Sequence, residues 1–82
     1  MKTYIYPAVF HEGRNAITVY FPDLACISQG KNYHQAFKRA REVLSLHLSG
    51  MLEDGEKLPA PSSLKSIALG EGEALALIET KL

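Results

Sequence analysis

The pattern of hydrophobic and polar positions divides the chain into strand-like and helix-like segments. Residues 2–10 are rich in aromatic and β-branched side chains, which favour strands. Residues 16–21 alternate apolar with polar positions, so that one face of a strand would be buried. Weaker patterns predict strands over residues 25–29 and 74–81. The last of these segments also suits a helix, because Ala and Leu favour helices, but a strand completes the sheet.

One long helix is predicted over residues 33–54. Asn32, followed three residues later by Gln35, is typical of a capping box, and Gly55 suits a left-handed helix end. Apolar side chains recur within the segment at steps of three and four residues, as a helix with one buried face requires. These side chains are Ala36, Phe37, Ala40, Val43, Leu44, Leu48 and Met51.

Turn signals separate these elements. Residues 11–15 read as a hairpin turn, Gly30 ends the third strand, and the two prolines of residues 56–63 indicate an extended connection. Residues 64–73 read as a loop with one short turn. The order strand, strand, strand, helix, strand predicts an α+β fold, a small and mainly antiparallel sheet with one long helix on one face. We expect residues 1–82 to form one domain.

Length, composition and charge narrow the class of function. A chain of 82 residues with 46% hydrophobic and 22% charged residues predicts a folded domain with a small core, which self-association or a partner would complement. Nine basic and nine acidic residues give no overall field that favours nucleic acid or an anionic membrane. Neither a signal peptide nor a run of ~20 apolar residues is present, so we expect a cytoplasmic protein.

The side chains that usually carry out catalysis or bind metal do not occur at the spacings that a catalytic or metal site needs. Three histidines and one cysteine lack the short spacing of zinc-ligand pairs, and Cys26 in a strand is typical of a small buried side chain. Neither a nucleophile elbow nor a phosphate-binding glycine loop is present. We therefore expect no metal, no cofactor and no enzymatic activity. The histidines are His11, His34 and His47.

Two surfaces are candidates for binding. Tyr6 and Tyr20, together with the open edges of a small sheet, fit a protein interface, and a homodimer through the last strand or another edge is one form of it. The helix carries the basic cluster Lys38, Arg39 and Arg41, which fits RNA binding. A solvated helix face is the alternative interpretation of these cations, since the neutral chain gives RNA little electrostatic attraction.

Several of these segments, in their order and spacing, resemble the HicB-like antitoxin domain. Residues 21–24 read Phe-Pro-Asp-Leu and match the family pattern outright, and residues 28–30 correspond to its T-x-G step. Residues 55–62 correspond to the proline-rich exit that follows the family's helix. The resemblance covers residues 3–63. It departs from the family pattern after Leu24, where Ala-Cys stands in place of Pro-Gly-Cys and one residue is missing.

The resemblance implies a partial ribonuclease-H-like fold and an antitoxin that binds a HicA-type toxin, a small mRNA-cleaving protein. A nuclease of that fold needs an Asp on its first strand, and residues 2–10 contain no acid, so we expect no nuclease activity. Tyr20 and Asp23 are the expected partner contacts, because they lie on the wet face of the second strand and in the following loop. The residues after 63 are too few for a last strand and a DNA-binding domain, so we expect no autonomous DNA binding.

Overall fold

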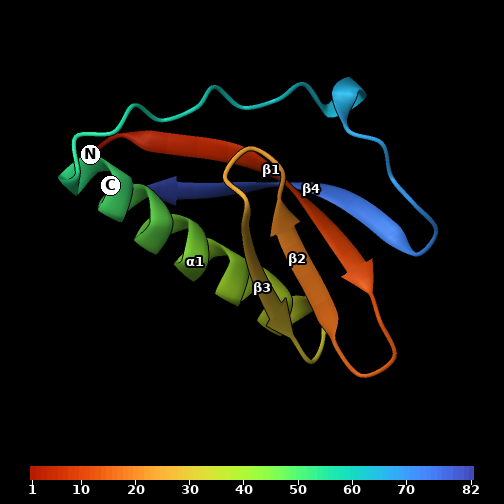
Figure 1. Cartoon of the computed structure of the whole chain (residues 1–82). Coiled ribbons are helices and arrows are strands. Elements are labelled where there is room, and N and C mark those ends of the chain that lie inside the picture. Colours follow the sequence, from red (N-terminus) through yellow and green to blue (C-terminus); the bar gives the residue numbers. More distant parts are fainter.

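The computed structural model describes residues 1–82 as a four-stranded antiparallel sheet with one long helix against one face (Figure 1). The predicted α+β fold and the predicted order of its elements are confirmed. The strands lie in the order β3-β2-β1-β4 across the sheet. The elements are β1 (Thr3–Glu12), β2 (Ile17–Phe21), β3 (Cys26–Gly30), α1 (Tyr33–Glu53), the short 3-10 helix η1 (Leu64–Ser66) and β4 (Glu73–Lys81).

The central strand β1 has unequal pairing on its two sides. It pairs with β4 from Thr3 to His11, but with β2 only from Val9 to Glu12. The first half of β1 therefore has a strand neighbour on one side only. Backbone groups on its other side need a different partner or solvent.

Hydrogen-bond alternation explains how the sheet accommodates Pro7, which has no N–H to donate. Lys2 and Leu82 exchange two backbone hydrogen bonds, with N–O distances of 2.7 and 2.9 Å. In an antiparallel pair, such residues alternate with facing residues that exchange none. Counting along the register from Lys2, Pro7 faces Leu77 in a pair that exchanges none. Its missing N–H therefore removes no hydrogen bond from the β1–β4 ladder.

The core lies between α1 and the sheet face that α1 covers. In β2, Ile17, Val19 and Phe21 are buried, and Thr18 and Tyr20 face the other way, which confirms the predicted alternation. Of the predicted helix positions, Phe37 is exposed at 37%, although its ring packs 4.6 Å from that of Phe10. The fully buried residues of α1 are Ala36, Ala40, Leu44 and Leu48.

Both ends of α1 form as the sequence predicts. Asn32 Oδ1 accepts a hydrogen bond from Gln35 N at 2.8 Å, and Gln35 Oε1 accepts one from Lys31 N at 2.7 Å. At the other end Gly55 has φ 72°, and Glu56 N donates to Met51 O at 2.9 Å. The cap at each end satisfies backbone groups that the helix itself leaves without partners.

The tight turn between β2 and β3 contains a strained residue. Ala25 has φ 52° and is the only residue other than glycine with a positive φ. Its N–H donates to Phe21 O at 2.9 Å, which closes the turn. The left-handed region costs an L-residue roughly 1–2 kcal/mol. A glycine at this position would adopt the same conformation without that cost.

Gly30 allows the end of β3 to approach the start of α1. A Cβ atom on Gly30 would lie 2.4 Å from Ala36 N and 2.7 Å from Ala36 Cα. Both neighbouring atoms belong to the helix backbone, so neither can move without shifting the helix. The glycine that the sequence suggests as a strand terminator is therefore also required by packing.

We expect Gly30→Ala to lower the free energy of unfolding by about 1–3 kcal/mol, because the added methyl group overpacks this contact. Gly50→Ala is the matched control. A Cβ at Gly50 meets nothing within 4 Å, and alanine in a helix interior is favoured by ~0.5–1 kcal/mol. Urea unfolding followed by circular dichroism measures both. Unchanged or raised stability of Gly30→Ala would contradict the close approach.

Candidate protein interface

A long connection, the strap (residues 56–72), leads from α1 to β4. In Figure 1 it runs beside β1 before it turns into β4. Tyr6 Oη donates to Pro59 O at 2.6 Å, and Ser62 N donates to Asp23 Oδ2 at 2.9 Å. Ser62 Oγ also donates to Asp23 Oδ1. Two side chains from the sheet region thus hold the strap beside the half of β1 that β2 does not reach.

Tyr6 serves this attachment rather than an exposed surface. It faces the core and is only 3% exposed, so the prediction that it contributes to an interface is wrong. Burial raises the pKa of the Tyr6 hydroxyl, and the negative charge of Asp23 and the neighbouring Tyr4 raise it further. The hydroxyl therefore stays protonated, as its role as donor to Pro59 O requires.

Asp23 lies in the β2–β3 turn and is half-buried. Both of its carboxylate oxygens accept hydrogen bonds from Ser62, which is 39 residues away in sequence. Hydrogen bonds to a charged acceptor are among the stronger ones in proteins. This engagement fixes the turn that follows Tyr20 and the middle of the strap relative to each other.

The strap covers part of the sheet face that points away from α1, here called the outer face. Pro7 and Val9 lie on this face but are buried. A groove of about 310 Å³ lies between the strap and the sheet. Its lining includes Val9, Tyr20, Pro22, Ser62, Ser66 and Ile67.

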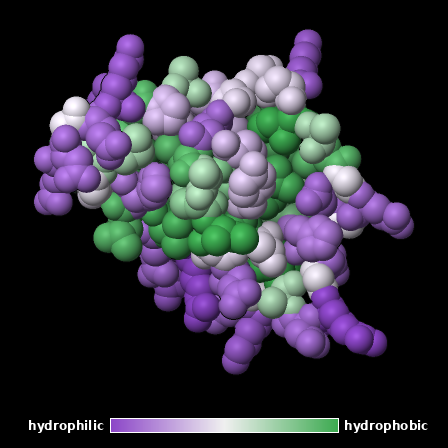
Figure 2. Space-filling model, viewed as in Figure 1, coloured by the Kyte–Doolittle hydropathy of each residue, from purple (hydrophilic) through white to green (hydrophobic).

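The rest of the outer face exposes apolar side chains. Tyr20 is 46% exposed and lies opposite Ile27 of β3, which is 66% exposed. Ile5 and Leu77 are exposed on the same face, toward β4. In the view of Figure 2, apolar side chains gather near the middle and charged side chains project from the rim. The buried Pro7 and Val9 of β1 lie between the pair Tyr20 and Ile27 and the residues toward β4, so the exposed apolar side chains form two groups on this face. Large apolar side chains exposed together are typical of a protein interface.

A family model described as "HicB_like antitoxin of bacterial toxin-antitoxin system" matches residues 6–76. The chain belongs to the HicB-like antitoxin family. The matched range includes most of β1, all of β2, β3, α1 and the strap, and the start of β4. On the C-terminal side it therefore extends beyond residue 63, where the resemblance in the sequence ends.

Two proteins are similar to this chain over most of its length. An uncharacterized 14.9 kDa protein from the rep-hol intergenic region of Haemophilus phage HP1 is 34% identical over 62 residues, 74% of this chain. The HicB-like chain spans about half, 47%, of the length of that curated relative. A chain from a HicA3 and HicB3 toxin-antitoxin complex is 26% identical, with a TM-score of 0.68 over 90% of this chain and 94% of that one.

Two further solved structures share the fold. One is a chain from a toxin-antitoxin complex of Streptococcus pneumoniae, with a TM-score of 0.86, 21% identity and coverage of 95% of this chain and 69% of that one. The other is the N-terminal domain of Burkholderia pseudomallei antitoxin HicB, with a TM-score of 0.78 and 24% identity. It is covered completely, by 96% of this chain.

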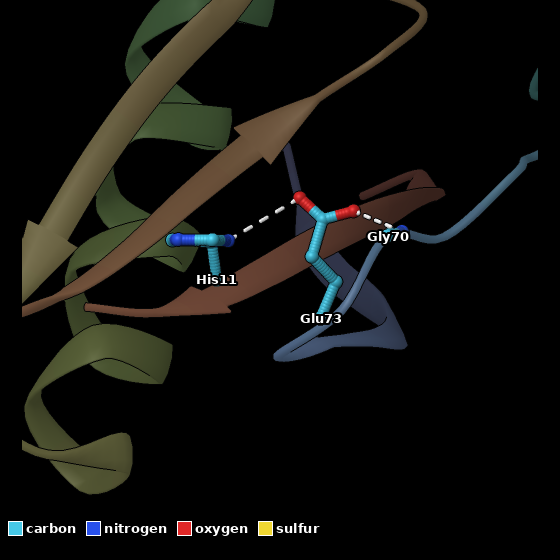
Figure 3. Close-up of polar contacts among 3 residues, drawn as sticks. All are labelled: His11, Gly70 and Glu73. Carbon is cyan, nitrogen blue, oxygen red and sulfur yellow. Dashed lines mark hydrogen bonds and ion pairs between the residues drawn. The ribbon is translucent and has the colours of Figure 1, made fainter.

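The polar border of the outer face in this HicB-like domain includes the only ion pair in the structure. His11 Nδ1 lies 3.5 Å from Glu73 Oε2, and Gly70 N donates to Glu73 Oε1 at 2.6 Å. Figure 3 shows the Glu73 carboxylate between the imidazole of β1 and the last turn of the strap. His11 is half-exposed, so the ion pair itself adds little stability. Its geometric effect is to fix the end of the strap at the start of β4.

The remaining candidate residues of the HicB-like domain lie apart. Lys38, Arg39 and Arg41 are exposed on α1 and form no ion pair. Cys26 is half-buried, and burial raises the pKa of its thiol, so the reactive thiolate is disfavoured. No group of three or more His, Cys, Asp or Glu side chains is placed to hold a metal ion. None of the helices is long and apolar enough to span a membrane.

We expect Asp23→Ala to lower the free energy of unfolding by about 1.5–3 kcal/mol, because Ser62 loses a charged acceptor. Asp23→Asn keeps one carbonyl oxygen and is expected to cost about 1 kcal/mol or less. Urea unfolding measures the total effect, and hydrogen exchange at the Ser62 amide measures the local one. Glu71→Ala, at an exposed position of the strap, is the control. Undiminished protection of the Ser62 amide in Asp23→Ala would show that the strap does not depend on this carboxylate.

Proposed function

We propose that this HicB-like domain binds a HicA-type, mRNA-cleaving toxin and silences it as a stoichiometric inhibitor without catalysis of its own. Membership of the antitoxin family is the observation that carries this proposal. A similar solved chain belongs to a HicA3 and HicB3 complex, which supports a partner of the same class. Inhibition would follow from covering the toxin's RNA-binding surface. Since mRNA is the toxin's substrate, the site of action would be the cytoplasm.

The outer face around β2 and β3 is the proposed contact surface. Tyr20 and Ile27 lie opposite each other and together expose a large apolar area, which burial against a partner would remove from water. Tyr20 also offers a hydroxyl that can hydrogen-bond at such an interface. Asp23 contributes by holding the turn and the strap that border this area, so the surface is ordered before binding.

Self-association is part of the same proposal. Twelve buried residues form the hydrophobic core cluster, which is a small core for a domain. Both edges of the sheet are open, because β3 and β4 each have one strand neighbour. We propose a homodimer through one of these edges.

RNA binding by the basic cluster on α1 is a second candidate function. Lys38, Arg39 and Arg41 are exposed and have no acidic partner, which leaves three free cations on one helix. Retention on RNA that weakens as salt rises, and weakens further when all three become Ala, would support this function. Retention that does not change with salt would contradict it.

Co-expression with a candidate HicA-type toxin from the same host, scored for growth, tests the antitoxin function. We expect growth to be rescued and a one-to-one complex to be recovered. Tyr20→Ala and Ile27→Ser are each expected to weaken that complex about tenfold or more, because an aromatic or large apolar contact at an interface centre carries much of its affinity.

Leu52→Ser is the matched control for these variants. Leu52 is 44% exposed, like Tyr20, but lies at the end of α1 and away from the outer face. It should leave the complex unchanged. Absence of both rescue and complex would remove the antitoxin function. Rescue that both outer-face variants preserve would place the toxin on another surface.

A further inference from the structure

The free edge of β4 presents a regular row of backbone groups. Leu82 is hydrogen-bonded to Lys2 of the neighbouring segment, and hydrogen-bonded pairs alternate along an antiparallel ladder. The even-numbered residues of β4 therefore direct their N–H and C=O groups toward β1. The odd-numbered residues from Glu73 to Lys81 therefore direct these groups away from β1, where no other strand lies. Such an edge is a template for pairing with another strand.

A groove beside this edge leaves room for the side chains of an added strand. It has a volume of about 480 Å³ and lies between α1 and the end of β4. Leu46, on its helix side, is 77% exposed. The groove is lined by Arg41, Glu42, Ser45, Leu46, Ser49 and Thr80.

The sequence of β4 is complementary to itself in one antiparallel register. When Leu77 faces Leu77 of a second copy, Glu73 faces Lys81 of that copy, and Leu75 faces Glu79. In this register each odd-numbered residue faces an odd-numbered residue of the second copy. Both residues of such a pair direct their N–H and C=O groups toward each other, so each pair can exchange two hydrogen bonds. The full length of β4 is paired, and a carboxylate meets an ammonium group at both ends.

Charge disfavours the neighbouring registers. Centring the pair on Ala76 places Glu73 opposite Glu79 of the second copy, and centring it on Glu79 places two Glu79 side chains opposite each other. Like charges directly opposite destabilise a sheet. Centring on Ile78 avoids like charges but leaves Glu73 without a partner. Registers that place an odd-numbered residue opposite an even-numbered one are excluded. In such a register an outward-directed N–H or C=O group would face a residue whose own groups are directed toward β1.

We propose that β4 pairs with β4 of a second copy of this chain, antiparallel and centred on Leu77, so that two four-stranded sheets join into one. This inference rests on the proposed self-association and not on toxin binding. It buries Leu77, which is 55% exposed in the single chain, at the two-fold axis. Tyr20 and Ile27 belong to β2 and β3, on the far side of β1, so the proposed toxin surface stays open in each copy.

Leu77→Pro tests the backbone part of the proposal. The N–H of Leu77 has no partner in β1, because Leu77 faces Pro7 in a pair without hydrogen bonds. Proline there removes only a donor that a second copy would use. Light scattering of the 82-residue chain is expected to give twice 9.0 kDa for the wild type. Leu77→Pro should give the single-chain mass, with its folded circular dichroism spectrum retained.

Charge reversal tests the register. Lys81→Glu and Glu73→Lys each place like charges at both ends of the strand pair, and each is expected to raise the dimer dissociation constant about tenfold. Glu73→Lys also removes the contacts with His11 and Gly70 N, so its circular dichroism spectrum is compared with that of the wild type. An equimolar mixture of the two variants restores opposite charges at both ends. We expect the mixture to regain the wild-type dissociation constant as a heterodimer.

The outcomes separate this inference from the antitoxin function. A wild type that is a single chain at every concentration would overturn the β4 pairing. A dimer unaffected by Leu77→Pro and by the charge reversals would also overturn it, because its interface would lie elsewhere. Toxin rescue by Leu77→Pro is scored in parallel, with growth equal to the wild type expected. Loss of dimerisation with retained rescue supports both proposals, and a dimer without any rescue supports only this one.

Discussion

The pairing between β1 and β4 is the interaction on which the rest of the structure depends. It joins segments from the two ends of the chain, with Thr3 facing Lys81. It buries Ile78 and Thr80 beneath α1, where Thr80 shares a hydrogen bond with Ser45. The same alternation that accommodates Pro7 decides which backbone groups of β4 face outward.

The short length of β2 creates the second constraint. Because the pairing between β1 and β2 stops at Val9, the first half of β1 lacks a strand on that side, and the strap occupies the position. Its prolines have no N–H to donate, so the strap cannot form a regular ladder there. Side chains attach it instead, through Tyr6 and Asp23. The apolar surface that carries Tyr20 and Ile27 is bordered by this attachment.

Local signals in the sequence predict the helix and the strands, but not the side-chain hydrogen bonds that hold the strap in place. The cap at Asn32, the left-handed Gly55 and the alternation in β2 depend on residues within a few positions of each other, and all three are confirmed. Tyr6 and Pro59 are 53 residues apart, and Asp23 and Ser62 are 39 apart, so no periodicity connects them. Tyr6 therefore resembles a surface aromatic residue in the sequence, although it is a buried donor. The partner contacts at Tyr20 and Asp23 stay predictions.

The distance in sequence between β1 and β4 has a kinetic consequence. The β1–β2 and β2–β3 hairpins close short loops and can form early, whereas closing β1 against β4 orders almost the whole chain at once. During synthesis, β1 therefore waits for its main partner until the end of the domain has left the ribosome. Until then one entire edge of β1 is unpaired. The step that completes the sheet is also the step that ends the period in which the nascent chain is most exposed to misassociation.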